Sequence, residues 1–143
     1  MKASKKTKWI ISILFALYMV VLLRLTVFRG SALYAEPQLN LSLFANLIQV
    51  WRDGGFWEFS RQFFGNIGWF VPFGFLLPFL LRRTSLLLVT AMGAGLSLAI
   101  ELAQYIFRVG VAELDDLILN TLGVVIGYLF YKLLGMITAK AKD

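Results

Sequence analysis

Residues 85–107 read SLLLVTAMGAGLSLAIELAQYIF, an apolar run of 23 residues in which Glu101 is the one ionisable acid or base. A helix of this length rises about 34 Å at ~1.5 Å per residue, which is enough to cross a hydrocarbon core of about 30 Å. The stretch therefore predicts a transmembrane helix. An ionisable group inside a membrane is costly, so Glu101 needs a structural or functional reason.

Three more apolar runs flank this one, at residues 9–28, 66–81 and 114–134. The first follows a lysine-rich start and is too long for a signal peptide, so we predict an uncleaved helix. The run at 66–81 would rise only about 24 Å. It contains Pro72 and Pro78, which predict a kinked, broken or re-entrant helix. The sequence thus predicts a single all-α domain, residues 1–143, with about four transmembrane helices.

Composition supports a membrane protein and excludes several chemistries. Of the 143 residues, 59% are hydrophobic and 15% charged, too apolar for a soluble domain of this size. Cys and His are absent, which excludes disulfides, thiol nucleophiles, Cys/His zinc sites and Ser-His-Asp triads. We predict no metal site and assign no cofactor. The net charge of +6 lies beside apolar runs, so it indicates lipid contact rather than nucleic acid.

The distribution of basic residues predicts the orientation, because Lys and Arg are enriched on the cytoplasmic side. With four spans and the N-terminus inside, five basic residues lie outside: Arg24, Arg29, Arg52, Arg61 and Arg108. Nine of the fourteen lie inside: Lys2, Lys5, Lys6, Lys8, Arg82, Arg83, Lys132, Lys140 and Lys142. We therefore expect a multi-pass protein of the cytoplasmic membrane with both termini cytoplasmic.

Residues 29–65 are expected to form an external loop that is too long for a bare connection. Phe44, Leu47, Ile48 and Trp51 recur at helical spacing, and more aromatic residues follow them. This pattern predicts an amphipathic segment lying at the outer headgroups. A lid over a site is the alternative interpretation.

Polar side chains recur at helical spacing in the outer half of the predicted bundle. Glu101, Gln104 and Arg108 share one helix face. On the last helix, Asp116 and Asn120 share a face with Gly123 and Gly127, a pattern that also allows close helix packing. Arg24 and Pro72 fall at similar depth on the other two helices.

These polar groups have structural explanations as well as chemical ones. Asp115 could cap the last helix, and Asp116 and Asn120 could hydrogen-bond between helices. Arg24 or Arg108 could pair with Glu101. As chemistry, the carboxylates could act as general acid and base or could hold a divalent cation.

Several motifs lie between residues 65 and 128: Gly65-Asn66-Ile67-Gly68-Trp69, Val71-Pro72-Phe73-Gly74-Phe75-Leu76-Leu77-Pro78, Glu101-Leu102-Ala103-Gln104, Asp115-Asp116-Leu117-Ile118-Leu119-Asn120-Thr121-Leu122-Gly123 and Gly127-Tyr128. In these motifs the sequence resembles the VanZ-like family of bacterial membrane proteins. Residues 40–44, Asn-Leu-Ser-Leu-Phe, resemble the family's Asn-Leu-x-Pro-Phe element but lack its proline. The resemblance implies a multi-helix protein of a bacterial cytoplasmic membrane. The family is named for a protein that lowers susceptibility to teicoplanin, a glycopeptide that binds cell-wall precursors at the outer face.

We combine the motif positions with the polar pattern into one predicted site in the outer half. Glu101 and Asp116 are the candidate acid and base. The candidate binding residues are Arg24, Asn66, Gln104, Arg108, Asp115 and Asn120. The candidate structural residues are Pro72, Gly74, Pro78, Gly123 and Gly127.

The leading hypothesis is a VanZ-like protein that modulates glycopeptide susceptibility through this pocket. The ligand would be a lipid-linked cell-wall precursor or an anionic lipid headgroup. The alternatives are a membrane-embedded enzyme acting on such a precursor, a non-enzymatic binder of a lipid or partner protein, a small ion-coupled transporter and a structural anchor. The sequence alone does not decide whether the protein is an enzyme.

Overall fold

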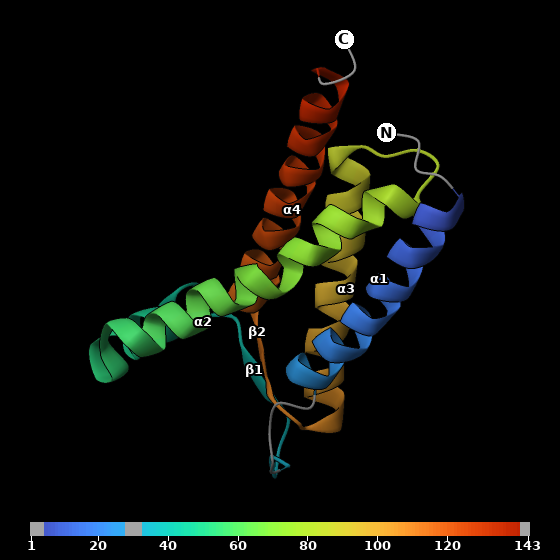
Figure 1. The fold of residues 1–143 in the computed structure, drawn as a ribbon. Coiled ribbons are helices and arrows are strands. Elements are labelled where there is room, and N and C mark those ends of the chain that lie inside the picture. The colour runs from blue at the N-terminus through green and yellow to red at the C-terminus, as the bar shows by residue number, and fades with distance from the viewer. Residues whose placement is uncertain (1–4, 28–32, 141–143) are drawn as a thin grey trace.

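A computed structural model describes residues 5–27 and 33–140 as a helical bundle with one small sheet (Figure 1). Lys2, Phe28, Arg29 and Lys142, which entered the predictions above, lie outside the described residues. The helices are α1 (Lys5–Thr26), α2 (Ala45–Leu80), α3 (Leu86–Phe107) and α4 (Leu114–Lys140). The strands are β1 (Gln38–Asn40) and β2 (Val111–Glu113). All four helices are long and apolar enough to cross a membrane, which confirms the predicted fold class.

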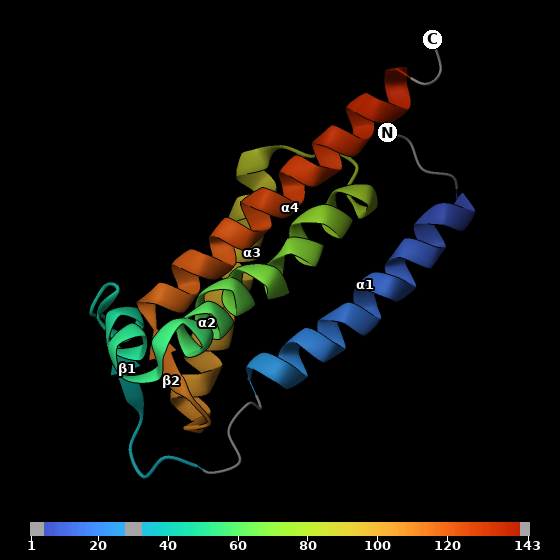
Figure 2. The ribbon, with the colours of Figure 1, turned by 60° about the vertical axis from the view of Figure 1, so that its left-hand side comes forward.

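The helices run alternately up and down between two ends of the bundle (Figures 1 and 2). The start of α1, the α2–α3 connection and the end of α4 lie at one end, and both strands lie toward the other. Helix α4 packs against α2 and α3, while α1 contacts α2. We call the end that carries β1 and β2 the strand end; it corresponds to the predicted outer half.

Three glycines allow α2 and α4 to approach closely. A Cβ atom placed at Gly74 would lie 2.0 Å from the Val124 carbonyl oxygen. At Gly123 it would lie 2.2 Å from the Ile67 oxygen, and at Gly127 it would lie 2.1 Å from the Val71 oxygen. Any side chain at these positions would collide with the backbone of the other helix. Small residues at a contact of this kind let two helix backbones pack in a membrane.

Helix α2 is longer than the span predicted at 66–81, and Pro72 and Pro78 do not break it. Helix α2 begins at Ala45, so most of the predicted amphipathic segment is continuous with the predicted span. The helix runs through Pro72 and Pro78, and its non-helical backbone lies at Gly55 (φ 67°, ψ −166°). Only glycine adopts this conformation readily because it lacks a Cβ atom.

A neighbouring helix supports α2 close to its first proline. Pro72 has no backbone N–H, so it cannot donate within the helix. The Tyr18 hydroxyl on α1 donates to the Trp69 carbonyl oxygen at 2.6 Å, nearly one turn before Pro72. The carbonyl that loses its helical donor at Pro72 is that of Gly68, so the Tyr18 bond ties α1 to α2 beside the proline without replacing the missing donor.

The two strands form a parallel pair that the sequence analysis did not predict. Gln38 pairs with Val111, and Asn40 pairs with Glu113. The pairing joins the segment before α2 to the connection between α3 and α4. Each strand has only three residues, so helical periodicity and apolar length give no signal for it.

The apolar side chains divide between the interior and the outside of the bundle. Leu22, Phe70, Val89 and Val124 are fully buried. Many other large apolar residues on the four helices remain exposed in the isolated chain. A bilayer provides the apolar surroundings that such residues need.

Candidate functional site

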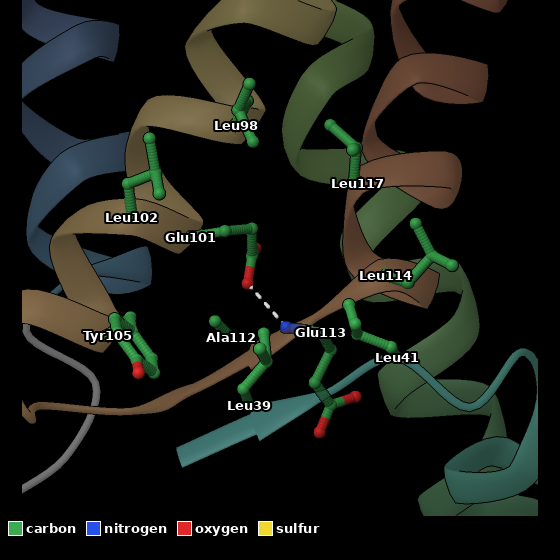
Figure 3. A pocket seen from close by; sticks show the side chains of 10 residues that line it. All are labelled: Leu39, Leu41, Leu98, Glu101, Leu102, Tyr105, Ala112, Glu113, Leu114 and Leu117. Atoms are coloured by element: carbon green, nitrogen blue, oxygen red, sulfur yellow. Dashed lines mark hydrogen bonds between the residues drawn. The ribbon is translucent and has the colours of Figure 1, made fainter. Parts of the chain in front are cut away.

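Glu101 is a buried carboxylate at the strand end. It lies on α3, and its side chain is only 6% exposed. The backbone N–H of Glu113 donates to Glu101 Oε2 at 2.8 Å, and Figure 3 shows the carboxylate pointing toward β2. Glu101 therefore holds β2 against α3 by satisfying a backbone donor.

Glu101 also lines a largely apolar cavity of about 370 Å³. Leucine side chains from α3, α4 and the segment around β1 surround it (Figure 3). A cavity of this volume lies within the usual range for small-molecule sites. Its full lining is Leu39, Leu41, Leu98, Glu101, Leu102, Tyr105, Ala112, Glu113, Leu114 and Leu117.

The Glu113 carboxylate points away from Glu101 (Figure 3). Both of its oxygens accept hydrogen bonds from Asn46 Nδ2, at 3.0 and 2.8 Å. This contact ties β2 to the first turn of α2. Neither Glu113 nor Asn46 belongs to the predicted site, because no local pattern places together two residues that are 67 positions apart.

The two aspartates at the start of α4 have different partners, both outside their own helix. Asp115 is 2% exposed, and its Oδ1 accepts the backbone N–H of Phe44 at 2.8 Å. Phe44 has left-handed backbone angles (φ 57°, ψ 0°) at the entry to α2. Asp116 Oδ1 instead accepts a hydrogen bond from the Asn66 side-chain amide on α2. The structure thus brings together Asn66 and Asp116, two residues of the predicted site.

Gln104 has one satisfied and one unsatisfied end. It is 8% exposed, and its Nε2 donates to the Thr26 carbonyl oxygen at 3.0 Å. Its Oε1 is buried and has no hydrogen-bond partner among residues 5–27 and 33–140. Gln104 lines a second pocket of about 200 Å³, and the other lining residues include Tyr34, Gln62, Glu113 and Asp116. We call this second cavity the polar pocket.

Asn120 is 4% exposed and donates to Ser97 Oγ on α3 at 2.9 Å. This contact is a hydrogen bond between helices, one of the two interpretations the sequence left open. Asn120 lines neither the leucine-rich cavity nor the polar pocket.

The two candidate arginines are exposed and lie at helix ends on the strand side. Arg108 ends α3 with left-handed backbone angles and donates to the Ala35 carbonyl oxygen at 2.8 Å. Arg24 lies in the last turn of α1. Neither lines the leucine-rich cavity or the polar pocket.

Acidic residues at the strand end do not form a metal cluster. Within the described part of the chain, no three Asp or Glu side chains converge in a way that could hold a metal ion. The chemistry of this end is that of hydrogen-bond acceptors, several of which already receive donors from backbone or asparagine groups.

The fold and these contacts define a class of protein. The chain is a four-helix polytopic membrane protein with buried carboxylate and amide side chains at one end of its bundle. The family model described as VanZ/LLP1 matches residues 15–135. Protein VanZ of Enterococcus faecium is 33% identical over 129 residues, which cover 86% of this chain and 72% of that protein. The chain belongs to the VanZ/LLP1 family. No solved structure matches it.

Proposed function

We propose that this protein lowers the susceptibility of the cell envelope to glycopeptides such as teicoplanin. The proposal is supported by membership of the VanZ/LLP1 family and by the 33% identity to Protein VanZ. It places the protein in a bacterial cytoplasmic membrane with both termini cytoplasmic. The strand end would then face outward, where glycopeptides meet their targets.

The main structural support for a binding site is Glu101, whose buried carboxylate belongs to a residue that lines the leucine-rich cavity. Membrane proteins retain buried ionisable groups where these have a defined task. The leucine-rich cavity and the polar pocket share Glu113 in their linings. An apolar cavity beside a polar one suits an amphiphile, such as a lipid-linked precursor or another envelope lipid.

The contacts favour binding over turnover. Glu101 and Asp115 each accept a backbone N–H, so both position segments of the chain. Acid–base roles for Glu101 and Asp116 stay predictions. So do the binding roles of Arg24, Asn66, Gln104, Arg108, Asp115 and Asn120.

Expression of Glu101→Gln in a teicoplanin-sensitive Gram-positive host tests the proposal. Glutamine retains the size of the side chain and an oxygen that can accept the Glu113 N–H, but it removes the charge. Glu58→Gln is the matched control, because Glu58 forms an exposed ion pair with Arg61. At equal membrane abundance, we expect wild type and Glu58→Gln to raise the inhibitory concentration of teicoplanin and Glu101→Gln to lose that effect.

Two results would contradict this proposal in different ways. Equal protection by wild type, Glu58→Gln and Glu101→Gln would show that Glu101 is not needed at the site. Protection by none of the three would contradict the glycopeptide role. Mass spectrometry of lipid-linked precursors incubated with the purified protein separates binding from catalysis. Saturable binding with unchanged precursor is expected, whereas a new product would favour the enzyme alternative.

A further inference from the structure

We propose that the polar pocket binds a primary ammonium group, of the kind that ends an ethanolamine headgroup. The inference names the headgroup chemistry of the envelope ligand and therefore rests on the proposed function. It is carried by three residues with acceptor side chains, from three elements, that line one pocket: Gln104 on α3, Glu113 on β2 and Asp116 on α4.

The hydrogen bond to Thr26 fixes the orientation of the Gln104 amide. A backbone carbonyl can only accept, so the group that meets the Thr26 oxygen at 3.0 Å must be the amide nitrogen. The other end of the amide is therefore the oxygen Oε1. This oxygen is buried without a partner in the described chain, and a buried acceptor left unsatisfied is costly. A ligand that donates a hydrogen bond would remove that cost.

The lining of the pocket also contains two carboxylates. The oxygens of Asp116 and Glu113 accept from the amides of Asn66 and Asn46, respectively. Ionised carboxylates carry negative charge and offer several acceptor positions each. Together with Gln104 Oε1, they form an acceptor-rich lining. A primary ammonium matches it because it has a positive charge and three N–H donors.

The size and position of the pocket fit a lipid headgroup. Its volume of about 200 Å³ is below the ~300–1,000 Å³ typical of drug-sized ligands, so it suits a small headgroup. Gly110 packs against Gln104, since a Cβ atom there would lie 3.2 Å from Gln104 Cδ. The pocket lies at the strand end, where lipid headgroups are expected.

Matched lipids provide the test. Phosphatidylethanolamine and phosphatidylcholine with the same acyl chains differ at the nitrogen, which has N–H donors only in the former. We expect the purified full chain, measured by native mass spectrometry, to retain phosphatidylethanolamine in preference to phosphatidylcholine. Free ethanolamine is the second probe. Competition by ethanolamine would assign recognition to the ammonium alone, and preference for the lipid without such competition would assign it to the lipid headgroup.

Two variants test the residues that carry the inference. Asp116→Asn and Glu113→Gln remove charge but retain oxygens that can accept from Asn66 and Asn46. Loss of one charge-assisted hydrogen bond predicts affinity for phosphatidylethanolamine about tenfold weaker or more, with Glu58→Gln unchanged. The inference would be overturned if wild type retained both lipids equally, or if both variants kept the wild-type affinity for phosphatidylethanolamine. Water would then be the expected partner of Gln104 Oε1.

The outcome is separable from that of the glycopeptide role. Selective retention of ethanolamine lipids without teicoplanin protection would sustain the ammonium site and reject the glycopeptide function. Teicoplanin protection without lipid selectivity would sustain the glycopeptide function and reject the ammonium site.

Discussion

Single residues at the strand end act mainly through partners that lie far away along the chain. Asp115 holds the backbone of Phe44, 71 positions earlier, and Asp116 holds Asn66, 50 positions earlier. The sequence singled out both aspartates, because acids at the start of an apolar helix are conspicuous. Capping of its own helix was one interpretation of Asp115, beside a binding role, whereas its Oδ1 accepts the Phe44 N–H at the entry to α2.

At this scale, Gly74→Ala and Gly127→Ala are expected to destabilise the protein. The new methyl group would lie about 2 Å from a carbonyl oxygen of the partner helix, so the two helices must separate. Overpacking of this kind costs about 1–3 kcal/mol, which would lower the thermal unfolding midpoint in detergent. Gly95→Ala on α3 is the control, because a Cβ atom there meets nothing within 4 Å. Unfolding midpoints equal to wild type in both α2–α4 variants would contradict the packing.

Helix α2 is the element in which local pattern and structure differ most. The prolines predicted a kinked, broken or re-entrant helix, yet α2 continues through them to Leu80 and has its kink at Gly55. The reason is that a proline removes only one hydrogen bond of the helix, while the backbone angles at Gly55 are strained for any residue that carries a Cβ atom.

Gly55→Ala is therefore expected to change the angle between the two parts of α2. Adopting these angles would cost alanine of the order of 1–3 kcal/mol, so the backbone should relax toward a helical conformation. The chain lacks cysteine, so cysteines introduced by Ile48→Cys and Phe64→Cys are the only sites that a thiol-reactive spin label would modify. They place one label on each side of Gly55. We expect the inter-label distance measured by pulsed electron paramagnetic resonance to shift. Gly65→Ala, at a position with no atom within 4 Å of a new Cβ, should leave it unchanged. A distance identical to the parent in Gly55→Ala would argue against the bend.

The whole molecule is organised by its two ends. Lys5, Lys6, Lys8, Arg82, Arg83 and Lys140 lie at or next to the helix ends opposite the strands. This arrangement agrees with the charge asymmetry that predicts cytoplasmic termini. The buried polar side chains Glu101, Gln104 and Asp115 gather at the strand end.

Cysteine accessibility in intact cells tests this orientation. We expect Glu36→Cys, at an exposed position before β1, to react with a membrane-impermeant maleimide. Thr84→Cys, in the α2–α3 connection, should react only after the membrane is permeabilised. This substitution leaves both Arg82 and Arg83 in place. The cysteine-free parent measures background labelling, and external labelling of Thr84→Cys would reject four full crossings with cytoplasmic termini.

The membrane class, the four apolar segments and the candidate polar residues follow from local sequence. These depend on local length, composition and helical spacing, because transfer of a segment into a bilayer is governed by that segment's own side chains. The pairing of polar groups depends on the folded arrangement: Glu101 accepts the Glu113 N–H, Asp115 accepts the Phe44 N–H, and Glu113 accepts from Asn46. The parallel pairing of β1 with β2 depends on the folded arrangement in the same way. Each joins segments through the relative positions of helix faces and connections, and no local periodicity encodes those positions.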